Sequence, residues 1–245
     1  MSFPYHGLPD WGLTGRKATV YGLDDLGEAV ARLGSPVVWD RRGDVFWIET
    51  FEYGLRKADV SGSPTGYTSQ LSSALAEHGP YCLVISPAAD SLATVAVQWF
   101  HPLPPYGGWG HEVWWSGYDI HGEIRFNMAY FTGTMSLVAR AIYSVPEENL
   151  YLLGAGEESH LIANNVGLLM DLSCYHVIKV VADFDTGYYK RVILDRETFE
   201  CEDIELYSLV TDKKPALNHW VNILKYGAST CELAIDTLIL TQNEP

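Results

Sequence analysis

Short runs of apolar residues, separated by turn-forming residues, dominate the chain from residue 37 onward. The runs YCLVISP, ATVAVQWF, IRFNMAYF and SLVARAIYS are rich in Val, Ile, Tyr and Phe. Apolar and polar residues alternate in them well enough to predict strands with one buried face. No repeat of fixed period is present, which argues against solenoids and propellers. The pattern therefore predicts a mainly β protein.

The clearest local pattern is a meander in the second half of the chain. Residues 177–184 and 188–194 are two β runs joined by DTG at 185–187, a short glycine-containing hairpin connection. DRE at 195–197 makes the next turn, and the run CELAIDTLILT would close a sheet near the C-terminus. Together these runs predict an antiparallel two-sheet, jelly-roll-like sandwich that occupies residues 37–245.

Residues 1–36 lack this strand pattern and form a predicted N-terminal arm. The sequence LDDLGEAVARLG predicts one short helix, with Asp24 as its cap and Gly34 at its end. A helix of two or three turns is too short to be stable alone. The segment before it carries many large apolar side chains, so the arm is predicted to dock on its own sandwich or on another chain. The residues assigned to this contact are Phe3, Tyr5, Leu8 and Trp11.

Composition and charge narrow the partners. The chain has 245 residues, of which 47% are hydrophobic and 19% charged, enough for a sizeable core. Its formal net charge of −15 opposes binding to phosphate backbones and anionic lipids, which predicts no nucleic-acid partner. No signal-peptide pattern and no apolar stretch of membrane-spanning length are found. We therefore expect synthesis in the cytoplasm and no membrane insertion. The four cysteines form no CxxC pair and are expected to be free thiols.

The meander carries a resemblance to a known architecture. The stretch HVIKVVADFDTGYYKRVILDRETFE, followed by CELAIDTLILTQNEP, resembles the back half of concanavalin A-like and laminin-G-like lectin or glucanase sandwiches. The resemblance covers about 85 of the 245 residues. It implies a concanavalin A-like β-sandwich, a fold shared by lectins, carbohydrate-binding modules, glycoside hydrolases, polysaccharide lyases and virion or adhesin domains. Fold alone does not choose between a binder and an enzyme.

A glycosidase needs a pair of carboxylates that flank the bond to be cleaved. Such enzymes display two carboxylates on one strand, and no E-x-D-x-x-E pattern is present. Asp183 and Asp185 fall at the hairpin, where aspartate is favoured for its side-chain to backbone hydrogen bonds. The resemblance leaves a calcium ion possible, with Asp183, Asp185 or the loop acids around Glu157 as its ligands, because laminin-G-like domains often bind calcium. No other cofactor is expected.

Histidines and aromatic residues are the other candidates. His101, His111 and His121 lie ten residues apart, a spacing that predicts loop or sheet-face residues and not ligands of one metal. An aromatic cluster within thirteen residues could stack on sugar rings, or could instead pack in the core or at an oligomer interface. Its members are Tyr106, Trp109, Trp114, Trp115 and Tyr118.

These observations favour a non-catalytic, lectin-like interaction module. It would bind a glycan or a protein partner, or act as a structural subunit of a homo-oligomeric assembly. A lectin-like fold without a secretion signal fits a phage or virus particle protein, which is released by lysis. The alternative is a carbohydrate-active enzyme, a glycoside hydrolase or polysaccharide lyase of concanavalin-like fold.

Overall fold

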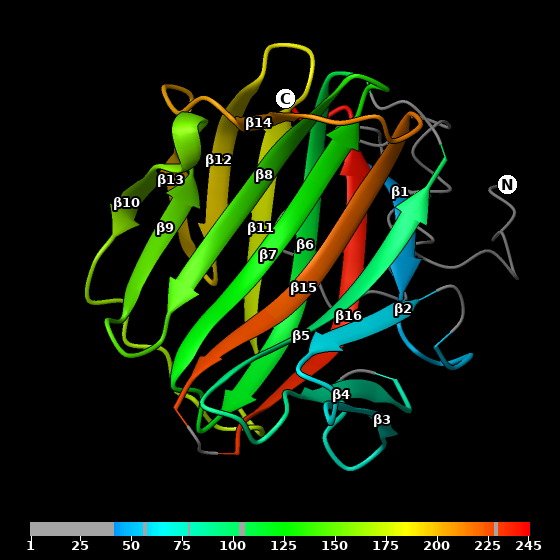
Figure 1. Ribbon diagram of the computed structural model, residues 1–245, viewed down its shortest axis with the longest axis vertical. Coiled ribbons are helices and arrows are strands. Elements are labelled where there is room, and N and C mark those ends of the chain that lie inside the picture. Colours follow the sequence, from blue (N-terminus) through cyan, green and yellow to red (C-terminus); the bar gives the residue numbers. More distant parts are fainter. Residues whose placement is uncertain (1–41, 56–57, 78, 103–105, 228–229) are drawn as a thin grey trace, which may run out of the picture.

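The computed structural model describes residues 42–245, apart from 56–57, 78, 103–105 and 228–229. Two antiparallel sheets are stacked face to face (Figure 1). The described part contains no α-helix, and its one helical element is the short 3-10 turn η2 (Ala155–Glu157). None of its helices has the length and apolar composition to span a bilayer. The predicted arm and its helix lie outside the described residues.

The front sheet in Figure 1 has the strand order β10-β9-β8-β7-β15-β5-β2. In addition, β14 pairs with the first part of β8, which β9 does not reach. Every pairing in it is antiparallel. Its strands are β2 (Asp59–Ser63), β5 (Leu92–His101), β7 (Gly122–Phe131), β8 (Met135–Ser144), β9 (Asn149–Leu153), β10 (Ser159–Ala163), β14 (Tyr207–Val210) and β15 (Ala216–Tyr226).

The back sheet has the order β13-β12-β11-β6-β16-β4-β3, and β1 pairs with β16. The C-terminal strand β16 therefore lies inside this sheet, between β6 and β4, and not at its edge. Its strands are β1 (Asp44–Glu49), β3 (Thr68–Ser72), β4 (Cys82–Ser86), β6 (Gly108–Tyr118), β11 (His176–Asp183), β12 (Tyr188–Leu194), β13 (Glu197–Glu200) and β16 (Glu232–Gln242).

The predicted meander is present as β11, β12 and β13. At the first turn the Asp183 carboxylate accepts the backbone N–H groups of Asp185 and Thr186, at 2.9 and 3.2 Å. Gly187 follows with a φ of 79°, a conformation that glycine adopts without strain. The turn chemistry inferred from the sequence is thus what connects these strands.

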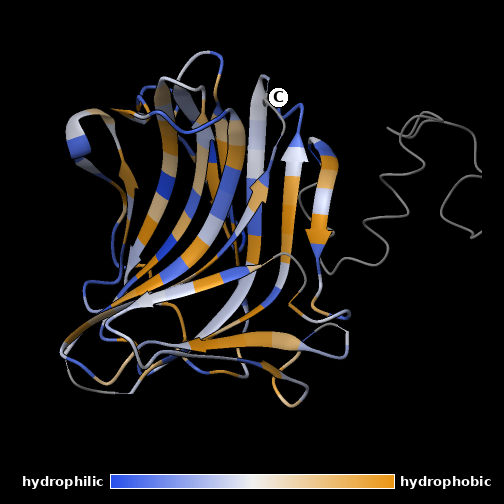
Figure 2. Cartoon of the chain, turned by 45° about the vertical axis from the view of Figure 1, so that its right-hand side comes forward, coloured by the Kyte–Doolittle hydropathy of each residue, from blue (hydrophilic) through white to orange (hydrophobic). Residues whose placement is uncertain are grey.

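The main core fills the space between the sheets. Alternate residues of each strand point into it, so hydrophobic and hydrophilic positions alternate along the strands in Figure 2. On β6, for example, Val113 and Trp115 are fully buried between the sheets, whereas Trp114 points to the other side of the back sheet and is only partly buried. Burial of this apolar surface is the main driving force for folding.

Three histidines form a hydrogen-bonded chain inside this core. His219 Nε2 lies 3.1 Å from His101 Nε2, and His219 Nδ1 lies 3.2 Å from His111 Nε2. Trp99 stacks on His219 with 5.4 Å between the ring centroids. Their sequence spacing gave no sign of this contact, because β5 and β15 of the front sheet meet β6 of the back sheet across the core. Burial lowers the pKa of His111 to about 3. Burial and the two neighbouring imidazoles also hold the pKa of His219 well below its ordinary value.

A buried ion cluster holds the C-terminal tail on the other side of the back sheet. The Glu244 carboxylate lies 2.7 Å from Lys179 Nζ, accepts a hydrogen bond from Thr241 at 2.5 Å and pairs with Arg191. The side chains of Lys179 and Glu244 are fully buried. A Cβ atom on Gly110 would come within 2.9 Å of the Glu244 carboxylate, so the glycine leaves room for it. The tail is therefore part of the fold.

We expect Glu244→Gln to lower the free energy of unfolding by about 3 kcal/mol, because two buried cations would lose their shared carboxylate. Urea unfolding at neutral pH measures this change. Glu200→Gln removes the same charge from an exposed position on β13 and should change stability by less than about 0.5 kcal/mol. Equal, small effects of the two substitutions would show that the cluster does not hold the tail.

The core histidines should make the protein sensitive to acid. Their folded pKa values lie below the unfolded value of 6.5, so the unfolded state binds more protons below that pH. His111 should therefore reduce the free energy of unfolding by about 1.4 kcal/mol per pH unit as the pH falls from 6.5 towards 3. His111→Gln should make the measured slope shallower by this amount, whereas His121→Gln, at an exposed position, should leave it unchanged. An unaltered slope in His111→Gln would refute this assignment.

Candidate functional site

A row of mostly polar side chains crosses the outer face of the front sheet. It runs over five neighbouring strands in register, because each residue is the direct cross-strand partner of the next. The flanking residues of each strand point into the core, which places these side chains on the opposite face. We call this set the polar row, and its members in spatial order are Asp59, Gln98, Trp220, Asn127 and Arg140.

Hydrogen bonds fix the side chains of the polar row. Gln98 Nε2 donates to the Asp59 carboxylate at 2.8 Å. Arg140 Nε donates to Asn127 Oδ1 at 2.5 Å, and Asn127 Nδ2 donates to Asn222 Oδ1 at 3.1 Å. These bonds hold the amides and the guanidinium in place before any ligand arrives. The row therefore combines fixed donors and acceptors with one partly buried indole.

Asn218 adds a side-chain oxygen that has no hydrogen-bond partner among the described residues. It lies two residues before Trp220 on β15 and therefore on the same face. Only 5% of the residue is exposed, and its Oδ1 atom accepts no hydrogen bond. Its cross-strand partner Phe100 is half exposed. A buried acceptor without a donor is destabilising, and a donor from a bound molecule would relieve this cost.

A cavity of about 520 Å³ lies further along the same face. The Tyr226 hydroxyl donates to Glu123 and the Tyr151 hydroxyl donates to Glu147, both at 2.7 Å. Arg125 also pairs with Glu123, at 2.6 Å. Burial and the bond to Glu123 raise the pKa of Tyr226, so this phenol stays protonated at neutral pH. The cavity thus extends the face with two tyrosines and two engaged carboxylates.

The strands do not present the pair of carboxylates that glycoside hydrolysis uses. Residues 123, 125 and 127 of β7 point outward, and only Glu123 among them is acidic. Its carboxylate is already bound by Arg125 and Tyr226. On β6 of the back sheet the corresponding acid, Glu112, is fully buried. Neither β6 nor β7 therefore displays two outward carboxylates on one strand, and the two carboxylates of the cavity, Glu123 and Glu147, are both hydrogen-bonded to tyrosines.

The aromatic cluster predicted to bind sugars does not form one surface. Trp109 and Trp115 are 4% and 0% exposed and belong to the core, so their assignment to a binding platform is wrong. Trp114 lines a groove at the side of the sandwich. Tyr106 and Tyr118 are exposed, but Tyr106 precedes the first residue of β6 and Tyr118 is its last residue, so they lie at opposite ends of the strand. Strand alternation sends neighbouring aromatic residues to opposite faces.

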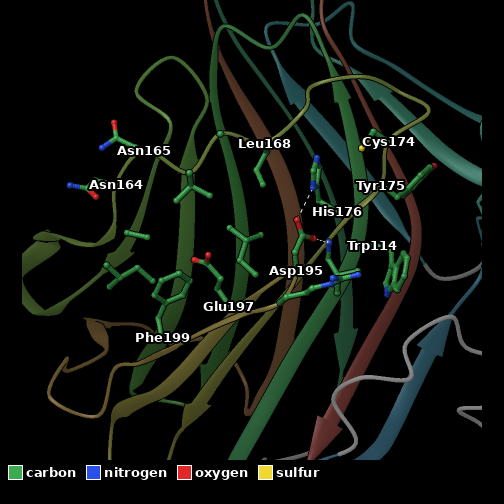
Figure 3. Close-up of a pocket in the computed structure, with 17 residues that line it drawn as sticks. Trp114, Asn164, Asn165, Leu168, Cys174, Tyr175, His176, Asp195, Glu197 and Phe199 are labelled. Atoms are coloured by element: carbon green, nitrogen blue, oxygen red, sulfur yellow. Dashed lines mark hydrogen bonds and ion pairs between the residues drawn. The ribbon is translucent and has the colours of Figure 1, made fainter.

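The groove beside Trp114 has a volume of about 1000 Å³ and lies between residues 162–168 and the β12–β13 turn (Figure 3). His176 Nδ1 contacts the Asp195 carboxylate at 2.9 Å, and His176 Nε2 lies 3.2 Å from the Leu169 carbonyl oxygen. Burial opposes protonation of His176, but these two acceptors outweigh it and raise its pKa. Since both ring nitrogens are engaged, His176 ties the groove's loop to the back sheet.

The predicted calcium ligands are engaged within the protein. Asp183 accepts the two turn N–H groups, and Asp185 accepts the backbone N–H of Gly107 at 2.8 Å. In the described ranges, no three His, Cys, Asp or Glu side chains are grouped to hold a metal ion. Both aspartates take part in turn formation, and calcium binding by them stays a prediction.

The front-face residues were missed in the sequence because they come from five separated strands. One signal was present on β15, where ALNHWVNILKY has polar or aromatic residues at three consecutive outward positions, between Ala216 and Leu224. Asn218, Trp220 and Asn222 share the outer face, between core positions. A buried strand of purely structural function does not need this pattern on its second face.

Comparison with known proteins supports the fold. A carbohydrate esterase from the Shiga toxin-encoding bacteriophage phi24B matches with a TM-score of 0.52 and 10% identity, over 82% of this chain and 100% of that one. An endo-β-1,4-glucuronan lyase from Trichoderma reesei matches with a TM-score of 0.52 and 7% identity, over 81% and 91%. A β-glucanase of Bacillus licheniformis gives a TM-score of 0.49 and 10% identity, over 80% and 98%.

The chain therefore has the concanavalin-like β-sandwich fold that its meander indicated. The two matches with TM-scores above 0.5 are named as enzymes that act on carbohydrates. No protein-family model and no curated protein sequence matches the chain. At identities of 10% and below, the structural matches show the fold alone.

Proposed function

We propose that the protein is a carbohydrate-binding module that holds a saccharide chain on the outer face of its front sheet. The observation that carries this proposal is the polar row, in which hydrogen-bonding side chains flank the indole of Trp220 in register over five strands. An indole offers a flat apolar surface for the C–H face of a sugar ring, and the amides bind its hydroxyl groups.

The spacing of the row suits an extended ligand. Neighbouring strands lie about 4.8 Å apart, which is similar to the length of one pyranose ring. A saccharide that crosses the strands would therefore meet one side chain of the row per sugar unit. The unpaired Oδ1 atom of Asn218, next to Trp220, would accept a hydrogen bond from a hydroxyl group. The ligand would thus supply the hydrogen-bond donor for this oxygen.

The same face supports binding over hydrolysis. Only one carboxylate, that of Glu123, projects from the outer face of β7, and Arg125 and Tyr226 bind it. The esterase and the lyase with this fold act on carbohydrates according to their names, which supports a saccharide as the class of ligand. The alternative, a carbohydrate-active enzyme, can be tested separately, because an enzyme would release product.

We expect Trp220→Ala to weaken saccharide binding at least tenfold, which corresponds to about 1.4 kcal/mol, because the stacking surface is lost. Isothermal titration against oligosaccharides that bind the unaltered protein measures this change. Trp220→Phe should retain part of the affinity. Tyr106→Ala, which removes an exposed tyrosine from the predicted cluster, should leave the affinity unchanged.

Thermal unfolding of each variant separates a binding defect from a folding defect. The proposal fails if Trp220→Ala folds and binds as the unaltered protein does, or if no oligosaccharide of a broad panel binds. Release of shorter saccharides during the same incubations would favour the carbohydrate-active enzyme.

Assembly into a homo-oligomer, a role in a virus particle and binding by the arm stay predictions, because Phe3, Tyr5, Leu8 and Trp11 lie outside the described residues. If the arm joins subunits, replacing these four residues with serine should convert a defined oligomer into monomers. The native mass of the full-length chain, with and without the substitutions, measures this. A monomer in both cases would contradict the assembly role.

A further inference from the structure

Arg140 lies at one end of the polar row and, unlike nearby Arg125, has no carboxylate partner in the described residues. Its side chain extends from β8 on the outer face of the front sheet and is partly buried. Its Nε atom donates to Asn127 Oδ1, which orients the guanidinium group. Within the described ranges, no Asp or Glu side chain forms an ion pair with Arg140.

Several other cations of the sandwich have such a partner. Arg125 pairs with Glu123 at 2.6 Å, and Arg191 pairs with Glu244. Lys190 lies 3.8 Å from the Asp183 carboxylate. Arg140 is thus the one cation of the polar row, and within the described ranges no carboxylate pairs with it. Burial, followed by the nearby charge of Arg125, lowers the pKa of Arg140, and the charge of Glu123 acts in the opposite direction without reversing the shift.

We infer that the polar row binds an acidic saccharide and that Arg140 binds the carboxylate of one of its uronate units. This inference rests on the proposed function and specifies its ligand. Arginine suits the task, because its planar guanidinium group can donate two parallel hydrogen bonds to a carboxylate. Asn127 separates Arg140 from Trp220, so the carboxylate belongs to a unit about two strand spacings, or roughly 10 Å, from the stacked ring.

The charge of the whole protein makes this recognition local. With a formal net charge of −15, the chain repels polyanions in general. An acidic saccharide that binds tightly must therefore find a specific cationic contact. The tyrosines and amides of the same face would bind its hydroxyl groups, as they would those of a neutral sugar.

Matched pairs of ligands test the inference. Oligomers of glucuronate, galacturonate and mannuronate would each be titrated beside their carboxyl-reduced forms, which keep length and linkage but lack the charge. We expect the unaltered protein to bind at least one acidic oligomer at least tenfold more tightly than its reduced form.

Substitutions then assign the preference to Arg140. Arg140→Gln should weaken binding of that acidic oligomer at least tenfold more than it weakens binding of the reduced form, which has no carboxylate to lose. Arg140→Lys keeps the charge without the paired donors and should give an intermediate loss. Arg196→Gln, at an exposed turn of the back sheet, removes the same charge and should leave both affinities unchanged.

The outcomes separate the two proposals. Equal binding of acidic and reduced oligomers, with dependence on Trp220, would overturn the role of Arg140 and keep the carbohydrate-binding function. Equal weakening of both ligands in Arg140→Gln would show that Arg140 supports the face only as a structural residue. Thermal unfolding of Arg140→Gln and Arg140→Lys confirms that the variants are folded. Absence of binding to every acidic and reduced oligomer would overturn both proposals.

Discussion

The structure depends on the alternation of each strand between the core and an outer face. On β15, Leu217, Val221 and Ile223 pack between the sheets, while Asn218 and Trp220 face outward. Core packing fixes the register, because a shift of one residue would exchange the two faces. Once the register is fixed, the outward residues of five strands are aligned without any further constraint. The polar row is thus positioned by the residues that lie behind it.

The two sheets use their outer faces differently. On the back sheet, Glu244 of the chain's own tail neutralises Lys179 and Arg191. On the front sheet, Arg140 has no acidic partner in the described residues and the Oδ1 atom of Asn218 accepts no hydrogen bond. Groups left unsatisfied by the fold are those that a ligand can satisfy. This difference favours the outer face of the front sheet as the face that binds a ligand.

The sequence predicted the scaffold better than the site. The β11–β12 hairpin could be recognised because its turn needs Asp183 and Gly187 within a few residues. The candidate site has no such local pattern, since its members come from five strands between residues 59 and 220. The aromatic cluster misled for the same reason: Trp115 and Trp114 are adjacent in sequence and lie on opposite faces of β6. Which aromatic residues meet a ligand is decided by pairing between distant strands.

The difference between a binder and an enzyme on this scaffold is confined to a few outward positions. Proteins of the same fold with identities of 7 to 10% include a carbohydrate esterase and a glucuronan lyase, so the sandwich itself carries no reaction. A general acid or base must be free to exchange its proton with the substrate. Glu123 is held by Arg125 and Tyr226, and its neighbour two residues further along the outward face is a cation. These contacts support our proposal that the outer face of the front sheet binds a ligand through side chains held in fixed positions and does not convert it.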